Sequence, residues 1–179
     1  MNKCQWLICL SLAAAPAAAA NVVNQDIYLA ASIGAHEFAD EAGGKFGIHL
    51  GGKNIFERGF MLGGELEFSK ITNDDFEKRY SGDKEDYSLA ANVPIGKRFE
   101  LGGENAIDAY GLIGYSSLRV YSDTASERLD GVRWGAGVDG NFSNFLVGLR
   151  YTQGKLDSDL VGDYTEKNLS LQLGYRFQL

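Results

Sequence analysis

The sequence predicts an all-β fold, an eight-stranded antiparallel up-and-down transmembrane β-barrel. Three observations support this prediction. Apolar residues alternate with polar or small residues along most of the chain, which is the period-two pattern of strands. No stretch of comparable length shows the 3.6-residue period of a helix. The final strand, which ends at Leu179, is apolar on one side and polar on the other, so one side suits hydrocarbon and the other suits water or polar partners.

Residues 1–20 have the features of a secretory signal peptide. A basic start is followed by an apolar run and a closing stretch of alanines. We therefore expect cleavage after residue 20 and one barrel domain over residues 21–179. Both cysteines, Cys4 and Cys9, would be removed with the signal peptide. The mature chain is then expected to form neither disulfides nor thiolate metal sites.

The first four strands follow from alternation. The third is the clearest, because Glu65 and Glu67 alternate with apolar neighbours. Polar segments at 36–44 and 71–86, and a turn at Lys53-Asn54, separate the four strands. The residues expected to face outward are, strand by strand, Ile27, Leu29, Ala31 and Ile33; Phe46, Ile48 and Leu50; Phe60, Leu62, Gly64, Leu66 and Phe68; and Tyr87, Leu89, Ala91, Val93 and Ile95.

The fifth strand, within residues 107–121, has apolar residues in both phases, so alternation alone does not decide which side faces the lipid. The phase chosen puts Arg119 inside the barrel. The residues that this phase turns outward are Tyr110, Leu112, Gly114, Leu118 and Val120.

The last three strands have a clear phase. A tight turn at Ser143-Asn144 separates the sixth from the seventh, and a loop over residues 154–166 precedes the eighth. The expected outward residues are Val132, Trp134, Ala136, Val138 and Phe142; Phe145, Val147, Leu149 and Tyr151; and Leu169, Leu171, Leu173, Tyr175, Phe177 and Leu179.

A soluble eight-stranded barrel would have the opposite polarity and would bury its apolar face around a ligand. Two features oppose that alternative. The inward set is charged, and aromatic residues fall near strand ends, where membrane barrels place their interfacial girdles. We therefore expect the apolar face to meet lipid.

The C-terminal run Gln172-Leu-Gly-Tyr-Arg-Phe-Gln-Leu179 resembles the insertion signal of bacterial outer-membrane barrels. With the strand count, the signal peptide and the alternation of long and short connections, the chain is similar to small eight-stranded barrels of the outer-membrane protein A and X type and to opacity-like surface proteins. This resemblance implies a bacterial outer-membrane location, with long loops extracellular and both termini periplasmic. It also implies recognition by the outer-membrane barrel assembly machinery. The residues that would carry the insertion signal are Gln172, Gly174, Phe177 and Leu179.

An eight-stranded barrel is just wide enough for side chains to fill its interior. Charges that face inward are therefore expected to pair across the lumen as a structural plug. A narrow porin-like channel is the alternative. The residues expected in this network are Glu65, Glu67, Arg119, Arg133, Asp139, Arg150 and Arg176.

No catalytic, cofactor or metal residues are predicted. The two histidines are His36, expected in the first loop, and His49, expected in the lumen, and neither has the His-x-Ser arrangement of the outer-membrane deacylases. The run Gly135-Ala-Gly-Val-Asp-Gly140 matches a dinucleotide fingerprint, but no helix follows to receive a phosphate. Gly135 and Gly137 are instead expected to make room for large lumen side chains. Residues 157–162 only partly match a calcium loop.

The mature chain has 16 basic and 24 acidic residues once Lys3 is removed, a net charge of about −8. The acids concentrate in the expected outer loops, which argues against nucleic acid as a partner. We expect a monomer in contact with outer-membrane lipid and lipopolysaccharide. The loop acids are expected to form a solvated rim that keeps the protein soluble during export. The alternative is that divalent cations bridge these acids to lipopolysaccharide phosphates, with Lys78, Arg79 and Lys84 touching phosphate directly. The predicted role is non-catalytic, in envelope integrity or surface interaction. An adhesin or invasion factor that binds host surface molecules through the loops is the alternative.

Overall fold

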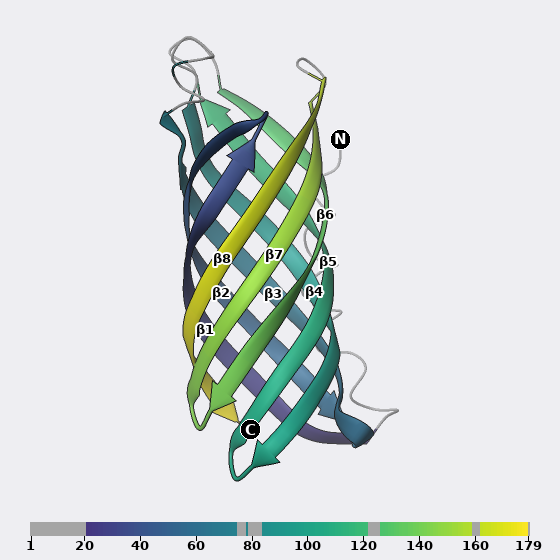
Figure 1. Ribbon diagram of the computed structural model, residues 1–179. Coiled ribbons are helices and arrows are strands. Elements are labelled where there is room, and N and C mark those ends of the chain that lie inside the picture. The colour runs from purple at the N-terminus through teal and green to yellow at the C-terminus, as the bar shows by residue number, and fades with distance from the viewer. Residues whose placement is uncertain (1–20, 75–77, 79–83, 122–125, 159–161, 179) are drawn as a thin grey trace.

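The computed structural model describes residues 21–74, 78, 84–121, 126–158 and 162–178. In this part of the chain eight strands form a closed barrel, and each strand pairs antiparallel with the next (Figure 1). The barrel closes between the first and last strands, from Asp26 opposite Gln178 to Phe38 opposite Glu166. The strands are β1 (Val22–Phe38), β2 (Glu41–Phe56), β3 (Phe60–Thr72), β4 (Lys84–Gly102), β5 (Asn105–Tyr121), β6 (Ser126–Phe142), β7 (Phe145–Ser158) and β8 (Gly162–Gln178).

The predicted polarity is confirmed on every strand except β5. The outward side chains are large and apolar: Ile33, Phe145 and Leu173 are each at least 60% exposed, whereas the adjacent inward residues Ser32, Leu146 and Gln172 are buried. A sheet with this arrangement is stable only where the outside is not water, because exposing so much apolar surface to water costs free energy in proportion to its area. None of the helices in the described residues is long and apolar enough to cross a membrane.

Several segments predicted to be loops or turns are strand instead. The expected first loop, 36–44, is strand except for the two-residue turn Ala39-Asp40. Lys53 and Asn54 lie inside β2, and most of the expected loop 154–166 belongs to β7 and β8. These strand extensions could not be predicted from alternation. Their outer face is polar as well as their inner face, so the apolar–polar pattern stops although the strand continues.

The two ends of the barrel differ in their connections. At the short-turn end, the strands are joined by Glu57–Gly59, 103–104 and 143–144. At the opposite end, which we call the 73–83 end, the connections are 39–40, 73–83, 122–125 and 159–161. The prediction of four long connections at this end is therefore wrong, because the strands extend into three of them and only 73–83 exceeds four residues.

The predicted phase of β5 is also wrong. Tyr110, Leu112 and Leu118 point into the lumen and are at most 5% exposed, whereas Ile113 and Tyr115 point outward and are 55% and 45% exposed. Both faces of this strand are apolar because its inner face contributes to apolar clusters inside the barrel. A rule that sends apolar residues to lipid cannot resolve such a strand.

The turn between β1 and β2 is strained. Ala39 and Asp40 have φ values of 53° and 65°, in the left-handed region that a tight two-residue hairpin requires and that glycine adopts most readily. Replacing Ala39 by glycine is expected to raise the free energy of unfolding by about 0.5–1 kcal/mol. Urea unfolding in lipid vesicles measures this change. The control, Ala35→Gly in regular β1, should lower stability, and an equal effect of both changes would contradict the strain.

Candidate functional site: the ionic core of the lumen

Twelve charged side chains, six acidic and six basic, are buried inside the described part of the barrel, each at most 7% exposed. Equal numbers of opposite charges allow each carboxylate to be matched to a cation, which offsets much of the large cost of removing ions from water. The acids are Asp26, Glu65, Glu67, Asp108, Asp139 and Glu166, and the bases are Lys45, Lys53, Arg98, Arg133, Arg150 and Arg176.

Arg98 organises the ion pairs nearest the short-turn end. Its guanidinium donates to Asp26 at 2.6 Å and to Asp108 at 2.7 and 2.9 Å. Arg176 adds a longer bond to Asp26, at 3.3 Å, and donates to the backbone oxygen of Ser143 at 2.6 Å. The last strand is thereby tied to the first strand and to the turn between β6 and β7.

Lys53 links these pairs to the middle of the lumen. Its Nζ donates to Oδ2 of Asp108 at 3.0 Å and to Oδ2 of Asp139 at 2.7 Å. The same ammonium lies 5.2 Å from the ring centre of Tyr28 and 5.3 Å from that of Tyr110. Lys53 therefore has two carboxylates and two aromatic rings around it, and both kinds of contact favour the charged amine.

Glu65 and Arg150 form the central pair. Two guanidinium nitrogens of Arg150 donate to the two oxygens of Glu65, at 2.5 and 2.9 Å. The Tyr28 hydroxyl, at 2.7 Å, and the Asn92 amide, at 3.0 Å, donate to the same carboxylate. Such bidentate, fully enclosed geometry is the strongest form of carboxylate recognition by arginine.

A third group lies toward the 73–83 end. Glu67 accepts from Arg133 at 2.9 Å and forms an ion pair with Lys45 at 2.9 Å. Lys45 also reaches Glu166, at 3.4 Å, so that one ammonium bridges two carboxylates. His36, expected in a loop, is instead buried in the lumen, with its Nδ1 2.8 Å from Oδ1 of Asn168.

Apolar side chains share the lumen with the ion pairs and form clusters of their own. At the 73–83 end, the cluster consists of Phe38, Ile71, Leu118, Leu129 and Leu156, each at most 2% exposed. Toward the short-turn end, Ile55, Met61, Tyr110 and Leu112 form a second cluster. Side chains thus fill the described lumen along its length, which is the packing of a plug.

Two glycines make room for the lumen tyrosines. Gly51 lies opposite Tyr28 on β1 and β2, and Gly137 lies opposite Tyr110 on β5 and β6. A Cβ atom on Gly137 would lie 2.6 Å from the Tyr110 ring, and one on Gly51 would lie 2.4 Å from the Tyr28 ring. The expectation that Gly137 makes room for a large side chain is confirmed, whereas the nearest atoms at Gly135 are backbone and Thr152.

Gly137→Ala is expected to lower the free energy of unfolding by about 1–3 kcal/mol, because the added methyl group must displace a ring enclosed in the lumen. Gly111→Ala is the matched control. Its Cβ would face outward with no atom nearer than 3.8 Å, so little change is expected. Urea unfolding of both variants measures the difference, and equal stability of the two would contradict the close approach of Tyr110.

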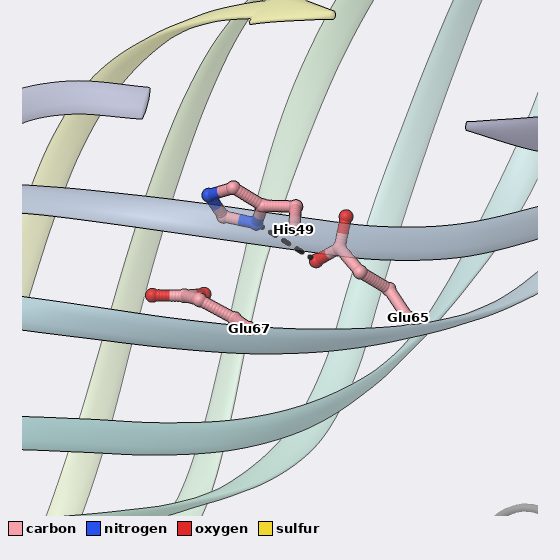
Figure 2. A group of neighbouring side chains, drawn as sticks. All are labelled: His49, Glu65 and Glu67. Atoms are coloured by element: carbon pink, nitrogen blue, oxygen red, sulfur yellow. Dashed lines mark ion pairs between the residues drawn. The ribbon is translucent and has the colours of Figure 1, made fainter. Parts of the chain in front are cut away.

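His49, Glu65 and Glu67 form a compact group that can be considered for metal binding (Figure 2). One ligand atom from each lies within 4.8 Å of the others. Both carboxylates, however, already accept bonds from cationic side chains, Glu65 from Arg150 and Glu67 from Arg133. A metal ion would have to displace these cations or lie beside them, so the group is better suited to ion pairing than to metal binding.

Ser32, His49 and Glu65 are arranged in the order of a nucleophile, a base and an acid. Nε2 of His49 lies 2.8 Å from the Ser32 hydroxyl, and its Nδ1 lies 3.5 Å from Oε1 of Glu65. Sequence spacing could not show this arrangement, because the three residues come from three strands. All three are at most 7% exposed, so the hydroxyl is buried in the described part of the barrel. The geometry therefore fits a structural hydrogen bond better than catalysis.

Six of the seven residues expected in the lumen network lie there. The exception, Arg119, points outward and donates to the Tyr87 hydroxyl at 3.1 Å, because the true phase of β5 is the opposite one. Sequence reasoning missed six charged members of the core. Extending the inward–outward alternation of each strand beyond its apolar outer positions would have identified most of them. They are Asp26, Lys45, Lys53, Arg98, Asp108 and Glu166.

The four residues of the expected insertion signal lie at the end of β8. Gln172 and Gly174 point inward and Phe177 points outward, while Leu179 lies outside the described residues. Of the lysine and arginine residues expected to touch phosphate, Lys78 is exposed, whereas Arg79 and the side chain of Lys84 are outside the described part.

Comparisons with known proteins agree with this architecture. The chain is similar in structure to Ail, the attachment invasion locus protein of Yersinia pestis (TM-score 0.55, 18% identity, 86% of this chain and 98% of that one). It is similar to Neisserial surface protein A (TM-score 0.58, 9% identity, 86% and 97%) and to the outer membrane enzyme PagL (TM-score 0.53, 17% identity, 82% and 97%). At these identities the likeness shows the fold alone. No curated protein matches the chain in sequence. The model of one family, the outer membrane protein beta-barrel domain, matches residues 6–177, and the chain belongs to that family.

Proposed function

We propose that this protein is a structural barrel of the bacterial outer membrane, which contributes to envelope integrity without catalysis and without conducting solutes. The observation that carries this proposal is the occupied lumen, in which twelve balanced charges and several apolar clusters are buried together. The 73–83 end is proposed to face outside the cell and both termini the periplasm, because long connections of such barrels are extracellular. The protein is proposed to be a monomer that contacts lipopolysaccharide and is inserted by the barrel assembly machinery.

Planar-bilayer recording tests the lumen directly. We expect no stepwise current from the wild-type protein, because paired charges and apolar clusters occupy the described lumen. Arg133→Met and Glu65→Gln should leave the trace unchanged as long as the barrel stays folded. Regular single-channel steps that change in size with either substitution would contradict the plug and favour the porin-like alternative. A deletion strain completes the test: the proposal expects greater sensitivity to detergent and to large antibiotics.

A second candidate function is surface adhesion. It is favoured by the segment 73–83, the one connection longer than four residues, at the end proposed to face outward. The structural neighbour Ail is an attachment invasion locus protein, which supports testing this function here. Replacing 73–83 by a two-residue turn should abolish adhesion to host cells while the barrel still inserts. Unchanged adhesion would contradict this candidate and leave the envelope role in place.

A further inference from the structure

The carboxylate of Asp26, on the first strand, is shared by two arginines from other strands. Its Oδ2 accepts from Nη2 of Arg98, on β4, at 2.6 Å and from Nη1 of Arg176, on β8, at 3.3 Å. All three residues are at most 3% exposed. Asp26 also lies at one end of the pairing of β1 with β8, opposite Gln178. Its bonds therefore join three strands beside the pair of strands in which the barrel closes, which we call the seam.

Each arginine is also held by partners that do not belong to β1. Two guanidinium nitrogens of Arg98 donate to the two oxygens of Asp108, ten residues away in the β4–β5 hairpin, at 2.7 and 2.9 Å. Arg176 donates from its side chain to the backbone oxygen of Ser143 at 2.6 and 3.2 Å. Its backbone N–H donates to the oxygen of Asn144 at 2.6 Å, in the same turn between β6 and β7. Both guanidinium groups are therefore oriented without the help of the first strand.

The partners of Asp26, in contrast, are far from it in sequence. Arg98 is 72 residues away and Arg176 is 150 residues away. The other carboxylate oxygen, Oδ1, accepts no hydrogen bond from the described residues. Contacts between distant parts of a chain cost more loop entropy than contacts within a hairpin, and this cost precedes the gain. The bonds of Asp26 are therefore expected to form at the end of folding, when β1 meets β8.

The carboxylate between two held guanidinium groups also favours one register of the seam. A slip of β8 against β1 that keeps the same side chains inside must be two residues long. Such a slip moves Arg176 by about 7 Å relative to Asp26 and breaks their bond. A buried charge that loses its partner is strongly destabilising, so the observed register is the favoured one.

We propose that Arg98 and Arg176 form a preformed binding site for the Asp26 carboxylate, and that the entry of this carboxylate is a latch that closes the barrel last and fixes its register. Arg176 belongs to the C-terminal run 172–179, which resembles an insertion signal. The segment expected to be recognised during assembly would thus also carry one of the two arginines of the latch.

Folding and unfolding rates of the barrel in phospholipid vesicles test the latch, with heat-modifiable gel migration as the readout of the closed barrel. Asp26→Asn should raise the unfolding rate about tenfold or more and change the folding rate by less than about twofold, because the bonds that it removes form after the folding transition state. Asp26→Glu keeps the charge and should recover part of the slow unfolding.

The matched control is Thr152→Val, at a residue that is 2% exposed. Its hydroxyl accepts from Arg133, 19 residues away, at 2.9 Å and from Asn168, 16 residues away, at 3.3 Å, and both partners are on adjacent strands. Because these bonds are local, their loss should slow folding. The latch would be overturned if Asp26→Asn slowed folding as much as Thr152→Val does, or if it left the unfolding rate unchanged.

Amide hydrogen exchange of the wild-type barrel gives a second test, which decides the question if Asp26→Asn does not fold. Contacts that form last are expected to open first, so amides paired between β1 and β8 should exchange faster than amides paired between β4 and β5. Equal protection of the two strand pairs would show that the seam is not the last part to close.

Discussion

Replacement of Lys53 by methionine is expected to lower the free energy of unfolding by about 3–5 kcal/mol, because it leaves two enclosed carboxylates without their shared cation. Lys53 is 2% exposed, and its ammonium is the link between Asp108 and Asp139. After the change, Asp108 keeps Arg98, but Asp139 keeps only the Tyr110 hydroxyl among the bonds that the structure shows, at 3.0 Å. Equilibrium urea unfolding in vesicles or micelles measures the loss.

Two further variants separate this effect from the loss of any lysine. Lys97→Met removes an outward-facing cation that lies 5.4 Å from the ring centre of Phe99, and its effect should stay below about 1 kcal/mol. Lys53→Met/Asp139→Asn should recover part of the stability, because the carboxylate that was left alone is also neutralised. If Lys53→Met costs no more than Lys97→Met, Lys53 does not occupy the ionic core.

The second large effect is expected at the central pair. Arg150→Met should cost about 3–5 kcal/mol, because Glu65 loses both bonds from the guanidinium in an enclosed site. Glu65→Gln should cost less, since the amide oxygen still accepts one of the two bonds that Tyr28 and Asn92 donate to Glu65. The double variant should be more stable than the sum of the single effects predicts, with a coupling energy of about 1–3 kcal/mol.

Urea unfolding of the two single variants and the double variant gives this coupling energy as a double-mutant cycle. Glu67→Gln/Arg150→Met is the matched control. Glu67 forms its ion pairs with Lys45 and Arg133 and has no bond to Arg150 in the structure. Its effects should be nearly additive. Additivity between Glu65 and Arg150 themselves would contradict the direct pair.

The faces of seven strands could be predicted from the sequence because the bilayer imposes a strong rule. Leu173 on the outside suits hydrocarbon, whereas its neighbour Gln172 on the inside suits a polar environment. Shifting the strand register by one residue would exchange the two environments and cost free energy. The same rule predicted that Glu65, Arg133 and Arg150 face inward. Their partners could not be assigned, since ion pairing across a barrel depends on register and depth, which alternation does not reveal.

The rest of the site was missed where the rule no longer applies. Lys53 and Glu166 belong to strand segments whose outward neighbours are not large and apolar, so these segments looked like turns and loops. The prediction of which β5 side chains point outward was wrong for the opposite reason. Its inner face carries Tyr110, Leu112 and Leu118, which pack inside the barrel, and the apolar content of a strand cannot distinguish an internal cluster from the lipid-facing belt.

Fluorescence quenching of Trp134 by lipids with brominated acyl chains tests most directly whether the apolar face meets lipid. Trp134 lies on the outer face of β6 and is 54% exposed. The Trp134→Phe protein gives the background, including any signal from Trp6. Strong quenching by the brominated chains, with little quenching by acrylamide in the water, is the predicted result. Strong quenching by acrylamide with none from the brominated chains would show that this face meets water, and the membrane barrel would be contradicted.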